Sequence, residues 1–183
     1  MSITPDTKDW TWVLERPCPE CGWDSSALPM DRAGATTRRI AEAWAEVLSR
    51  GSLRERPSPD VWSPLEYGCH VRDVFRIGSV RLRLMLSEQD PTFANWDQDA
   101  AATEDDYASQ DPSIVAAELV RAAADIAALI AELEPSQHGR AGLRSDGSHF
   151  TVESFTRYLL HDPVHHLHDV GAGLDDPLDL KST

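Results

Sequence analysis

Apolar side chains recur at intervals of three and four residues in four separate stretches of the chain. This spacing places them on one face of an α-helix, so each stretch is predicted to be helical. Between the stretches lie segments rich in Pro, Gly, Ser or Asp, which interrupt helices. The pattern therefore predicts four helices, over residues 31–50, 63–88, 111–133 and 151–171.

Three of the four predicted helices begin with residues that stabilise a helix N-terminus. In Ser63-Pro64-Leu65-Glu66 the Ser can cap the helix, the Pro fits the first helical position, and the Glu completes a capping box. Asp111-Pro112 repeats the combination of cap and proline, and Thr151 is the predicted cap of the last helix. Local chemistry and hydrophobic periodicity therefore agree on where these helices start.

The segments outside the helices divide the chain into an arm and a bundle. Residues 1–30 are rich in Pro and Trp and show no helical period, which predicts an irregular N-terminal arm. The connection over residues 90–110 is acidic and is predicted to be a solvated loop, and no segment predicts a sheet. Helices with one apolar face each pack together, so the predicted fold class is all-α, with a four-helix bundle over residues 31–183. The long connection leaves the topology of the bundle open.

Composition and charge narrow the classes of function. The chain has 183 residues, the size of one domain, and 41% of them are hydrophobic, which is enough for a core. A formal net charge of −14 repels nucleic-acid phosphates and anionic lipids. No stretch approaches the roughly 18 apolar residues of a membrane span, and the N-terminus has no signal-peptide pattern. We therefore expect a cytoplasmic protein without nucleic-acid or membrane partners.

Histidines gather in the last predicted helix. His161 and His165 are four residues apart, so they lie one above the other on one helix face, whereas His166 is rotated from His165 by about 100°. Two imidazoles at this spacing can bind one metal ion. A third ligand is expected from a facing helix, and His70 lies within the apolar positions of the second predicted helix. Three imidazoles with one open position are typical of a reactive metal site.

Other interpretations of these residues remain open. A single histidine on an apolar helix face, such as His70, is commonly a core residue with a hydrogen-bond partner. Asp162 and His166 can supply hydrogen bonds to metal-bound imidazoles, because such imidazoles usually donate their second nitrogen to a partner. Both residues are equally compatible with a solvated helix surface.

Two segments of the chain carry a family resemblance. They are Trp62-Ser63-Pro64-Leu65-Glu66-Tyr67-Gly68-Cys69-His70 and His161-Asp162-Pro163-Val164-His165-His166. Together they resemble the DinB-like superfamily of small metal-binding four-helix proteins, over about residues 31–172. Relatives include the mycothiol-dependent maleylpyruvate isomerases and the bacillithiol S-transferases, which bind a divalent ion, often zinc or nickel. The resemblance implies that His70, His161 and His165 are ligands of a divalent metal ion, with zinc expected first and nickel as the alternative.

The thiol-dependent members of this superfamily imply a reaction. The metal lowers the pKa of a low-molecular-weight thiol such as mycothiol, and the thiolate attacks a small-molecule electrophile. With a cis-alkene this chemistry gives isomerisation, and with a halide or epoxide it gives conjugation, so an S-transferase or isomerase is expected. A metal-dependent hydrolase and a non-catalytic metal-binding or stress-associated protein are the alternatives. A homodimer is compatible with the sequence, although no coiled-coil heptad requires one.

The predicted arm contains a Cys-x-x-Cys motif, formed by Cys18 and Cys21. Its two-residue spacer lets both sulfurs reach one metal ion, so the motif can supply half of a tetrahedral zinc site. A redox pair and a loop without cysteine chemistry are the other interpretations. Completion of a site would need a partner chain or further histidines; the candidates are His138, His149 and His168. Alternatively, the arm folds over the histidines of the last helix and brings a thiolate to the same metal. The third cysteine, Cys69, is expected to be a buried apolar residue.

Overall fold

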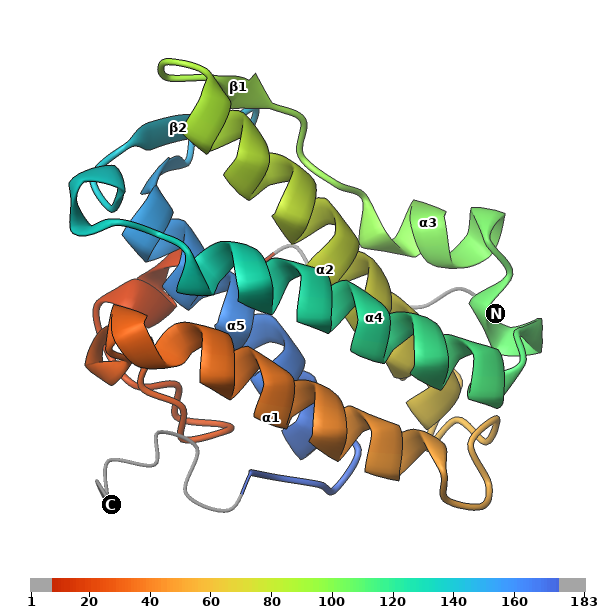
Figure 1. Cartoon of the computed structure of the whole chain (residues 1–183). Coiled ribbons are helices and arrows are strands. Elements are labelled where there is room, and N and C mark those ends of the chain that lie inside the picture. Colours follow the sequence, from red (N-terminus) through yellow and green to blue (C-terminus); the bar gives the residue numbers. More distant parts are fainter. Residues whose placement is uncertain (1–7, 175–183) are drawn as a thin grey trace, which may run out of the picture.

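Four long helices form a bundle in the computed structural model of the protein, which describes residues 8–174 (Figure 1). They are α1 (Met30–Leu48), α2 (Pro64–Ser87), α4 (Pro112–Ala131) and α5 (Val152–Asp169). The predicted all-α class and the four-helix bundle are confirmed. The ends of the predicted arm and bundle, residues 1–7 and 175–183, lie outside the described residues.

The predicted caps are present at the helix N-termini. The Ser63 hydroxyl accepts a hydrogen bond from the backbone N–H of Glu66, and the Glu66 carboxylate accepts one from the backbone N–H of Ser63 at 2.8 Å. The Asp111 carboxylate accepts from two backbone N–H groups at the start of α4. Thr151 accepts from the backbone N–H of Ser154 at the start of α5. These bonds satisfy donors that the first helical turn leaves without a partner.

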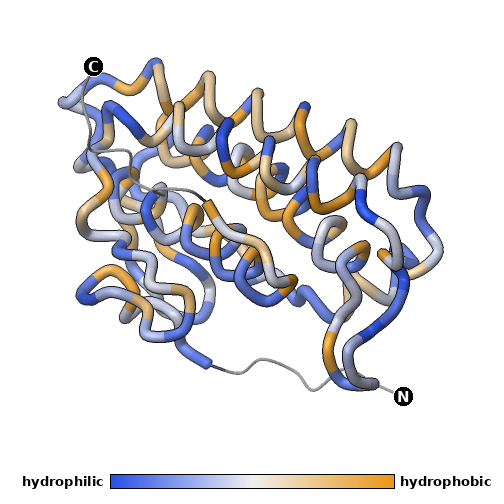
Figure 2. Tube along the Cα trace, turned by 90° about the horizontal axis from the view of Figure 1, so that it is seen from below, coloured by the Kyte–Doolittle hydropathy of each residue, from blue (hydrophilic) through white to orange (hydrophobic). Residues whose placement is uncertain are grey.

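The packing of the helices settles the topology that the sequence left open. The helix α1 packs mainly on α4, and α4 also packs along α2. On the other side of the bundle, α5 packs against both α2 and α1, as Figure 1 shows. Apolar positions alternate with hydrophilic ones along the helices (Figure 2), as expected when each helix buries one face. The main contacts of α1 are therefore with α4, and only weaker ones are with the next long helix, α2.

A small sheet closes one end of the bundle, so the prediction of no sheet was wrong. It contains β1 (Thr92–Phe93), β2 (Ala141–Arg144) and β3 (His149–Thr151). The strand β2 pairs in parallel with β1 and antiparallel with β3. Strands of two to four residues are too short to show a clear alternation of apolar and polar residues. Their pairing depends on contacts between distant parts of the chain.

The acidic connection between α2 and α4 is more ordered than a solvated loop. It contains β1, the short helix α3 (Gln98–Glu104) and a 3-10 helix, η3 (Tyr107–Ser109). Most of its acidic side chains are exposed, as expected, but Phe93 and Tyr107 are buried. The Tyr107 hydroxyl donates a hydrogen bond to Asp73 on α2 at 2.7 Å. This buried tyrosine fixes the connection against the bundle.

The N-terminal arm is irregular, as the sequence indicates, but it contributes to the core. Its two 3-10 helices are η1 (Thr11–Leu14) and η2 (Ser25–Ala27), and both pack against α5. Val13, Trp23 and Leu28 are buried, and the Arg157 guanidinium of α5 donates to the backbone carbonyl of Leu28 at 3.1 Å. The arm therefore covers the face of α5 that carries the clustered histidines. Among residues 8–174, no helix combines the length and the apolar character needed to span a bilayer.

Candidate metal centre

A cavity of about 760 Å³ lies beside α2 and α5. The arm, the α2–α4 connection and the turn between β2 and β3 also contribute to its wall. This volume lies within the range of about 300–1,000 Å³ that is usual for sites that bind small molecules. The cavity is therefore large enough for an organic substrate.

Three potential metal ligands meet beside this cavity, and two of them, Asp162 and His166, line it. His70 of α2 and Asp162 and His166 of α5 each offer one ligand atom, and these atoms all lie within 4.8 Å of one another. We call these three residues the cavity cluster. Asp162 Oδ1 is 3.1 Å from Nε2 of His70 and 3.8 Å from Nε2 of His166. Asp162 and His166 are four residues apart, so both face α2 from one side of α5.

Aromatic rings and a carboxylate hold the two histidines of the cavity cluster. The ring of His70 stacks on Trp96 with 5.2 Å between centroids and an angle of 6°, and it also contacts Trp62. His70 is buried, and its Nδ1 has no hydrogen-bond partner among the described residues, so its polar contact is made through Nε2. Nδ1 of His166 lies 2.8 Å from Asp169 Oδ2. Because a carboxylate only accepts, this contact places the hydrogen on Nδ1 and leaves Nε2 facing the cluster.

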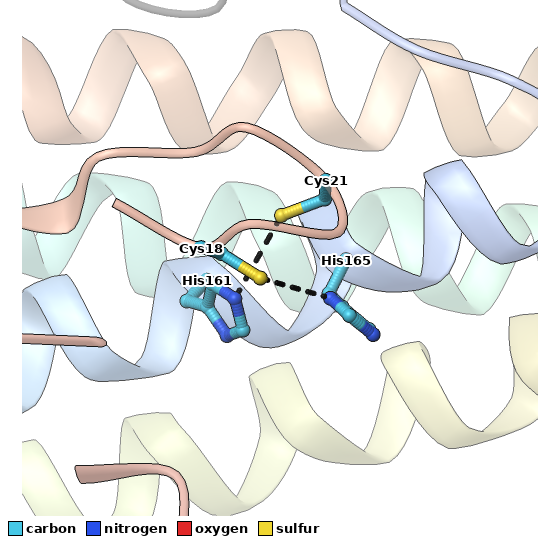
Figure 3. Close-up of side chains that lie close together, drawn as sticks. All are labelled: Cys18, Cys21, His161 and His165. Carbon is cyan, nitrogen blue, oxygen red and sulfur yellow. Dashed lines mark hydrogen bonds between the residues drawn. The ribbon is translucent and has the colours of Figure 1, made fainter. Parts of the chain in front are cut away.

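A second group of potential ligands joins the arm to α5. Cys18, Cys21, His161 and His165 each offer one ligand atom, again with all atoms within 4.8 Å of one another. We call these four residues the arm cluster. Figure 3 shows the two thiols of the arm pointing toward the two imidazoles of α5. Cys18 Sγ is 3.7 Å from His165 Nδ1, and Cys21 Sγ is 3.8 Å from His161 Nε2.

A tight turn presents the two thiols of the arm cluster. The backbone N–H of Cys18 donates to the carbonyl of Trp23 at 2.8 Å, and that of Gly22 donates to the carbonyl of Cys18 at 2.9 Å. Gly22 has a φ of 75°, which a residue with a side chain adopts only with strain. The sequence Cys-Pro-Glu-Cys-Gly thus folds locally into a loop that turns both sulfurs to the same side.

Burial and neighbouring charges set the protonation of both clusters. Burial lowers the pKa of His161 to about 4, and the nearby His165 adds to this effect. Burial also lowers the pKa of His165. Burial raises the pKa of Cys21 to about 12. The backbone N–H of Trp23 stabilises the thiolate and opposes this rise, but burial outweighs it. Burial opposes ionisation of Asp162, but its neighbours His70 and His166 outweigh it and hold its pKa well below the usual range. The two arm-cluster imidazoles are therefore neutral near pH 7, the form that binds metal.

The structure groups the predicted site residues differently from the sequence analysis. His161 and His165 do lie one above the other, with ring centroids 5.3 Å apart. Within residues 8–174, however, His70 does not share one group of ligand atoms with them. The reason is rotational, because the face of α5 that carries residues 161 and 165 turns toward the arm. The face one residue further along carries residues 162 and 166 and turns toward α2. The structure thus places His70 in one group of potential ligands and His161 and His165 in another, and which of these residues bind a metal stays a prediction.

Both clusters are completed by residues that the sequence analysis did not place among the three predicted histidine ligands. Asp162 and His166, predicted as possible hydrogen-bond partners of the ligands, lie directly against His70. Cys18 and Cys21 lie against His161 and His165, which is the arrangement in which the arm folds over the last helix. The arm cluster includes none of the other histidines proposed to complete it, which were His138, His149 and His168.

Some site residues were not identified from the sequence. Trp62 and Trp96 enclose His70, but tryptophans are commonly core residues and their positions gave no specific signal. Asp169 follows His166 by three residues, a spacing at which helix side chains meet, so this contact was predictable. Glu20 lies between the two arm cysteines, and its carboxylate is 3.5 Å from Nε2 of His165. Only the folding of the arm onto α5 brings Glu20 there.

Comparison with known proteins agrees with this architecture. The sequence model of the DinB superfamily matches residues 33–170. A solved structure with a similar fold is that of YfiT from Bacillus subtilis, at 20% sequence identity and a TM-score of 0.60, with 91% of this chain and 89% of that chain covered. YfiT is described as a probable metal-dependent hydrolase with an unusual four-helix bundle topology. None of the curated proteins matches the chain. With the family match over most of its length and the shared bundle, the chain belongs to the DinB superfamily.

Proposed function

We propose that the protein is a metal-dependent enzyme that binds a divalent cation, with zinc expected first, at His70, Asp162 and His166. We further propose that it catalyses the attack of a low-molecular-weight thiol on a small electrophile, as an S-transferase or isomerase in the cytoplasm. The observation that carries the proposal is the convergence of two imidazoles and a carboxylate beside a cavity of about 760 Å³, which Asp162 and His166 line.

The chemistry of the donor set fits a divalent cation. Two histidines and one carboxylate form the ligand set of many catalytic zinc sites, and three protein ligands leave a position for a reactant. When bound, such a cation supplies Lewis acidity, which favours ionisation of a thiol or water molecule. The contact between His166 and Asp169 supports the same assignment, because a carboxylate commonly fixes the tautomer of a metal-binding histidine.

The attacking group must come from solution, because the described cavity wall offers no cysteine. Cys18 and Cys21 face the imidazoles of the arm cluster. Cys69 is buried beside the backbone carbonyl of Tyr107, and burial raises the pKa of its thiol to about 12. A thiol that is protonated and enclosed in this way is a poor nucleophile. The cavity has room for an added thiol together with a small electrophile.

The charges on the cavity wall favour some substrates over others. Its described lining contains seven aspartates and three basic side chains; they are Asp9, Asp60, Asp97, Asp99, Asp146, Asp162 and Asp169, against Lys8, Arg81 and Arg144. Excess negative charge retains a cation and repels anions. We therefore expect uncharged or cationic electrophiles to react faster than phosphorylated ones.

The test measures thiol consumption by the zinc-loaded protein. Mycothiol is mixed with an alkyl halide, an epoxide or a cis-alkene, and loss of thiol or formation of the isomer is followed. We expect turnover that requires both metal and thiol, and a loss of at least tenfold in His70→Ala. The matched control is His149→Ala, because His149 is exposed on β3 and belongs to neither cluster of potential ligands. Equal rates for the wild type and His70→Ala would contradict the proposal.

A metal-dependent hydrolase is the second candidate function. It is favoured by the similarity to YfiT, which is described as a probable metal-dependent hydrolase, and it would use the same three ligands with water as the nucleophile. The two candidates differ in one measurable property, since a hydrolase turns over esters or amides with no thiol present. Metal-dependent hydrolysis that is unchanged by added mycothiol would favour this second candidate.

A further inference from the structure

The arm cluster contains none of the ligands of the proposed function, and it has its own chemistry. Cys18 and Cys21 come from the arm, and His161 and His165 come from α5 (Figure 3). We propose that these four residues form a second metal site, a tetrahedral zinc site that fastens the arm to the last helix.

The distances between ligand atoms match those around a zinc ion. Zinc–sulfur bonds of about 2.3 Å and zinc–nitrogen bonds of about 2.0–2.1 Å at tetrahedral angles separate sulfur from nitrogen by about 3.6 Å. The separation between Cys18 and His165 is 3.7 Å, and that between Cys21 and His161 is 3.8 Å. Both sulfur–nitrogen separations therefore fit a shared zinc ion, and all four ligand atoms lie within 4.8 Å of one another.

The number of ligands assigns this site a structural role. Two thiolates and two imidazoles complete the four positions that zinc prefers, so no position is left for a substrate or water. The cavity cluster has three ligands, one of which is a carboxylate, whereas the arm cluster has four ligands, two of which are sulfurs. The two sites thus differ in ligand number and in chemistry.

Two carboxylates lie near the nitrogen of His165 that points away from the thiols. Its Nδ1 faces Cys18, while its Nε2 lies 3.5 Å from Glu20 Oε2 and 3.8 Å from Asp169 Oδ1. Carboxylates on the far nitrogen of a metal-binding histidine fix its tautomer and strengthen it as a ligand. The ring of Trp10 covers the site, with its centroid 4.9 Å from that of His165. Glu20 belongs to the same Cys-Pro-Glu-Cys loop, so the arm supplies both ligands and a supporting carboxylate.

The two clusters share one short stretch of α5. Residues 161 and 165 face the arm, and residues 162 and 166 face α2, so the ligands of the two sites alternate along the helix. An ion in the arm cluster therefore fixes the rotation of this stretch about its axis. Trp10, whose ring lies against His161 and His165, lines the cavity together with both histidines. Loss of the zinc from the arm cluster is expected to weaken metal binding at the cavity cluster, although the two clusters share no ligand.

The first experiment uses the His70→Ala variant of the full chain, in which the cavity cluster lacks a ligand. The protein is purified without a chelating tag, its zinc content is measured, and the ligands are identified by X-ray absorption at the zinc edge. We expect one retained equivalent of zinc with two sulfur neighbours. Zinc without sulfur neighbours would overturn the proposal, as would a metal-free protein in which Cys18 and Cys21 form a disulfide.

The second experiment compares the double variant Cys18→Ser/Cys21→Ser with the matched control Cys69→Ser. The double variant should bind one equivalent of zinc less than the wild type, and its arm amides, including the backbone amide at position 18, should exchange hydrogen faster. Cys69→Ser should retain all zinc, because Cys69 lies in neither cluster. Full zinc content in the double variant would overturn the proposal. If the double variant does not fold, the absorption measurement on His70→Ala decides alone.

Failure of this proposal is distinguishable from failure of the proposed function. Zinc with two sulfur neighbours in a protein that shows no turnover would support the zinc site of the arm cluster and contradict the proposed reaction. Thiol-dependent turnover in a protein without sulfur-ligated zinc would do the opposite.

Discussion

Replacing Tyr107 with Phe tests how the α2–α4 connection is held on the bundle. Tyr107 is fully buried, and its hydroxyl donates to Asp73 Oδ2 at 2.7 Å. A hydrogen bond to a charged group contributes about 1.5–3 kcal/mol to stability. The same oxygen still accepts from Arg72 at 2.9 Å in the variant, so the carboxylate keeps a partner. We therefore expect Tyr107→Phe to lower the free energy of unfolding by about 1.5–2 kcal/mol, the lower part of that range.

Urea denaturation at fixed zinc concentration measures this change. With a slope of about 2 kcal/mol per molar urea, the midpoint should fall by roughly 1 M. The control is Tyr67→Phe, because the structure records no hydrogen bond from the Tyr67 hydroxyl among residues 8–174. This control should change stability by less than about 0.5 kcal/mol. If the midpoints of the two variants shifted equally, the assigned contribution of the Tyr107–Asp73 bond would be refuted.

The pH dependence of the Tyr107→Phe effect gives a further check. Burial opposes ionisation of Asp73, but hydrogen bonds from Arg72 and Tyr107 hold its pKa below 3.8. A carboxyl whose folded pKa is lowered adds stability above its unfolded pKa, and this stability is lost as the pH falls through the folded pKa. The difference between the wild type and Tyr107→Phe should therefore be constant between about pH 5 and 8 and shrink below about pH 4. A difference that grows on acidification would contradict the role of the ionised carboxylate.

Three further predictions concern packing, capping and metal. Gly34→Ala places a Cβ 2.9 Å from the backbone carbonyl oxygen of Ala127, so α1 becomes overpacked on α4. This overpacking should outweigh the gain in helix propensity and lower the free energy of unfolding by about 1 kcal/mol, as measured by urea denaturation. The control is Gly139→Ala, because a Cβ added there has no heavy atom within 4 Å. Equal losses of stability in the two variants would contradict the close approach of Gly34 to Ala127. Ser63→Ala removes the cap of α2 and should cost about 1 kcal/mol, with the slope of the transition unchanged. Removal of metal by a chelator should lower the melting temperature, and readdition of zinc at 100 times its Kd should restore about 2.7 kcal/mol; an unchanged melting temperature would argue against bound metal.

The four helices were predictable from the sequence because their determinants are local. The capping box at Ser63 and Glu66 and the Asp cap of α4 act within a few residues, and apolar spacing identifies the buried face. The small sheet was not predictable, since β1 and β2 are about 50 residues apart and each is very short. The order at Tyr107 was hidden for a related reason, because its partner Asp73 lies on a different element.

The sequence by itself determined which potential metal ligands share a helix face or a loop, and the tertiary structure decided how they combine. His161 and His165 share a face of α5 through helical periodicity alone, and Cys18 and Cys21 share a side of their loop through a two-residue spacer. Which helix face turns toward His70, and which toward the arm, depends on the rotation of α5 within the bundle. That rotation follows from the burial of side chains contributed by all four long helices and the arm. Such long-range packing leaves no local pattern in the sequence, and it separates seven potential ligands into two clusters.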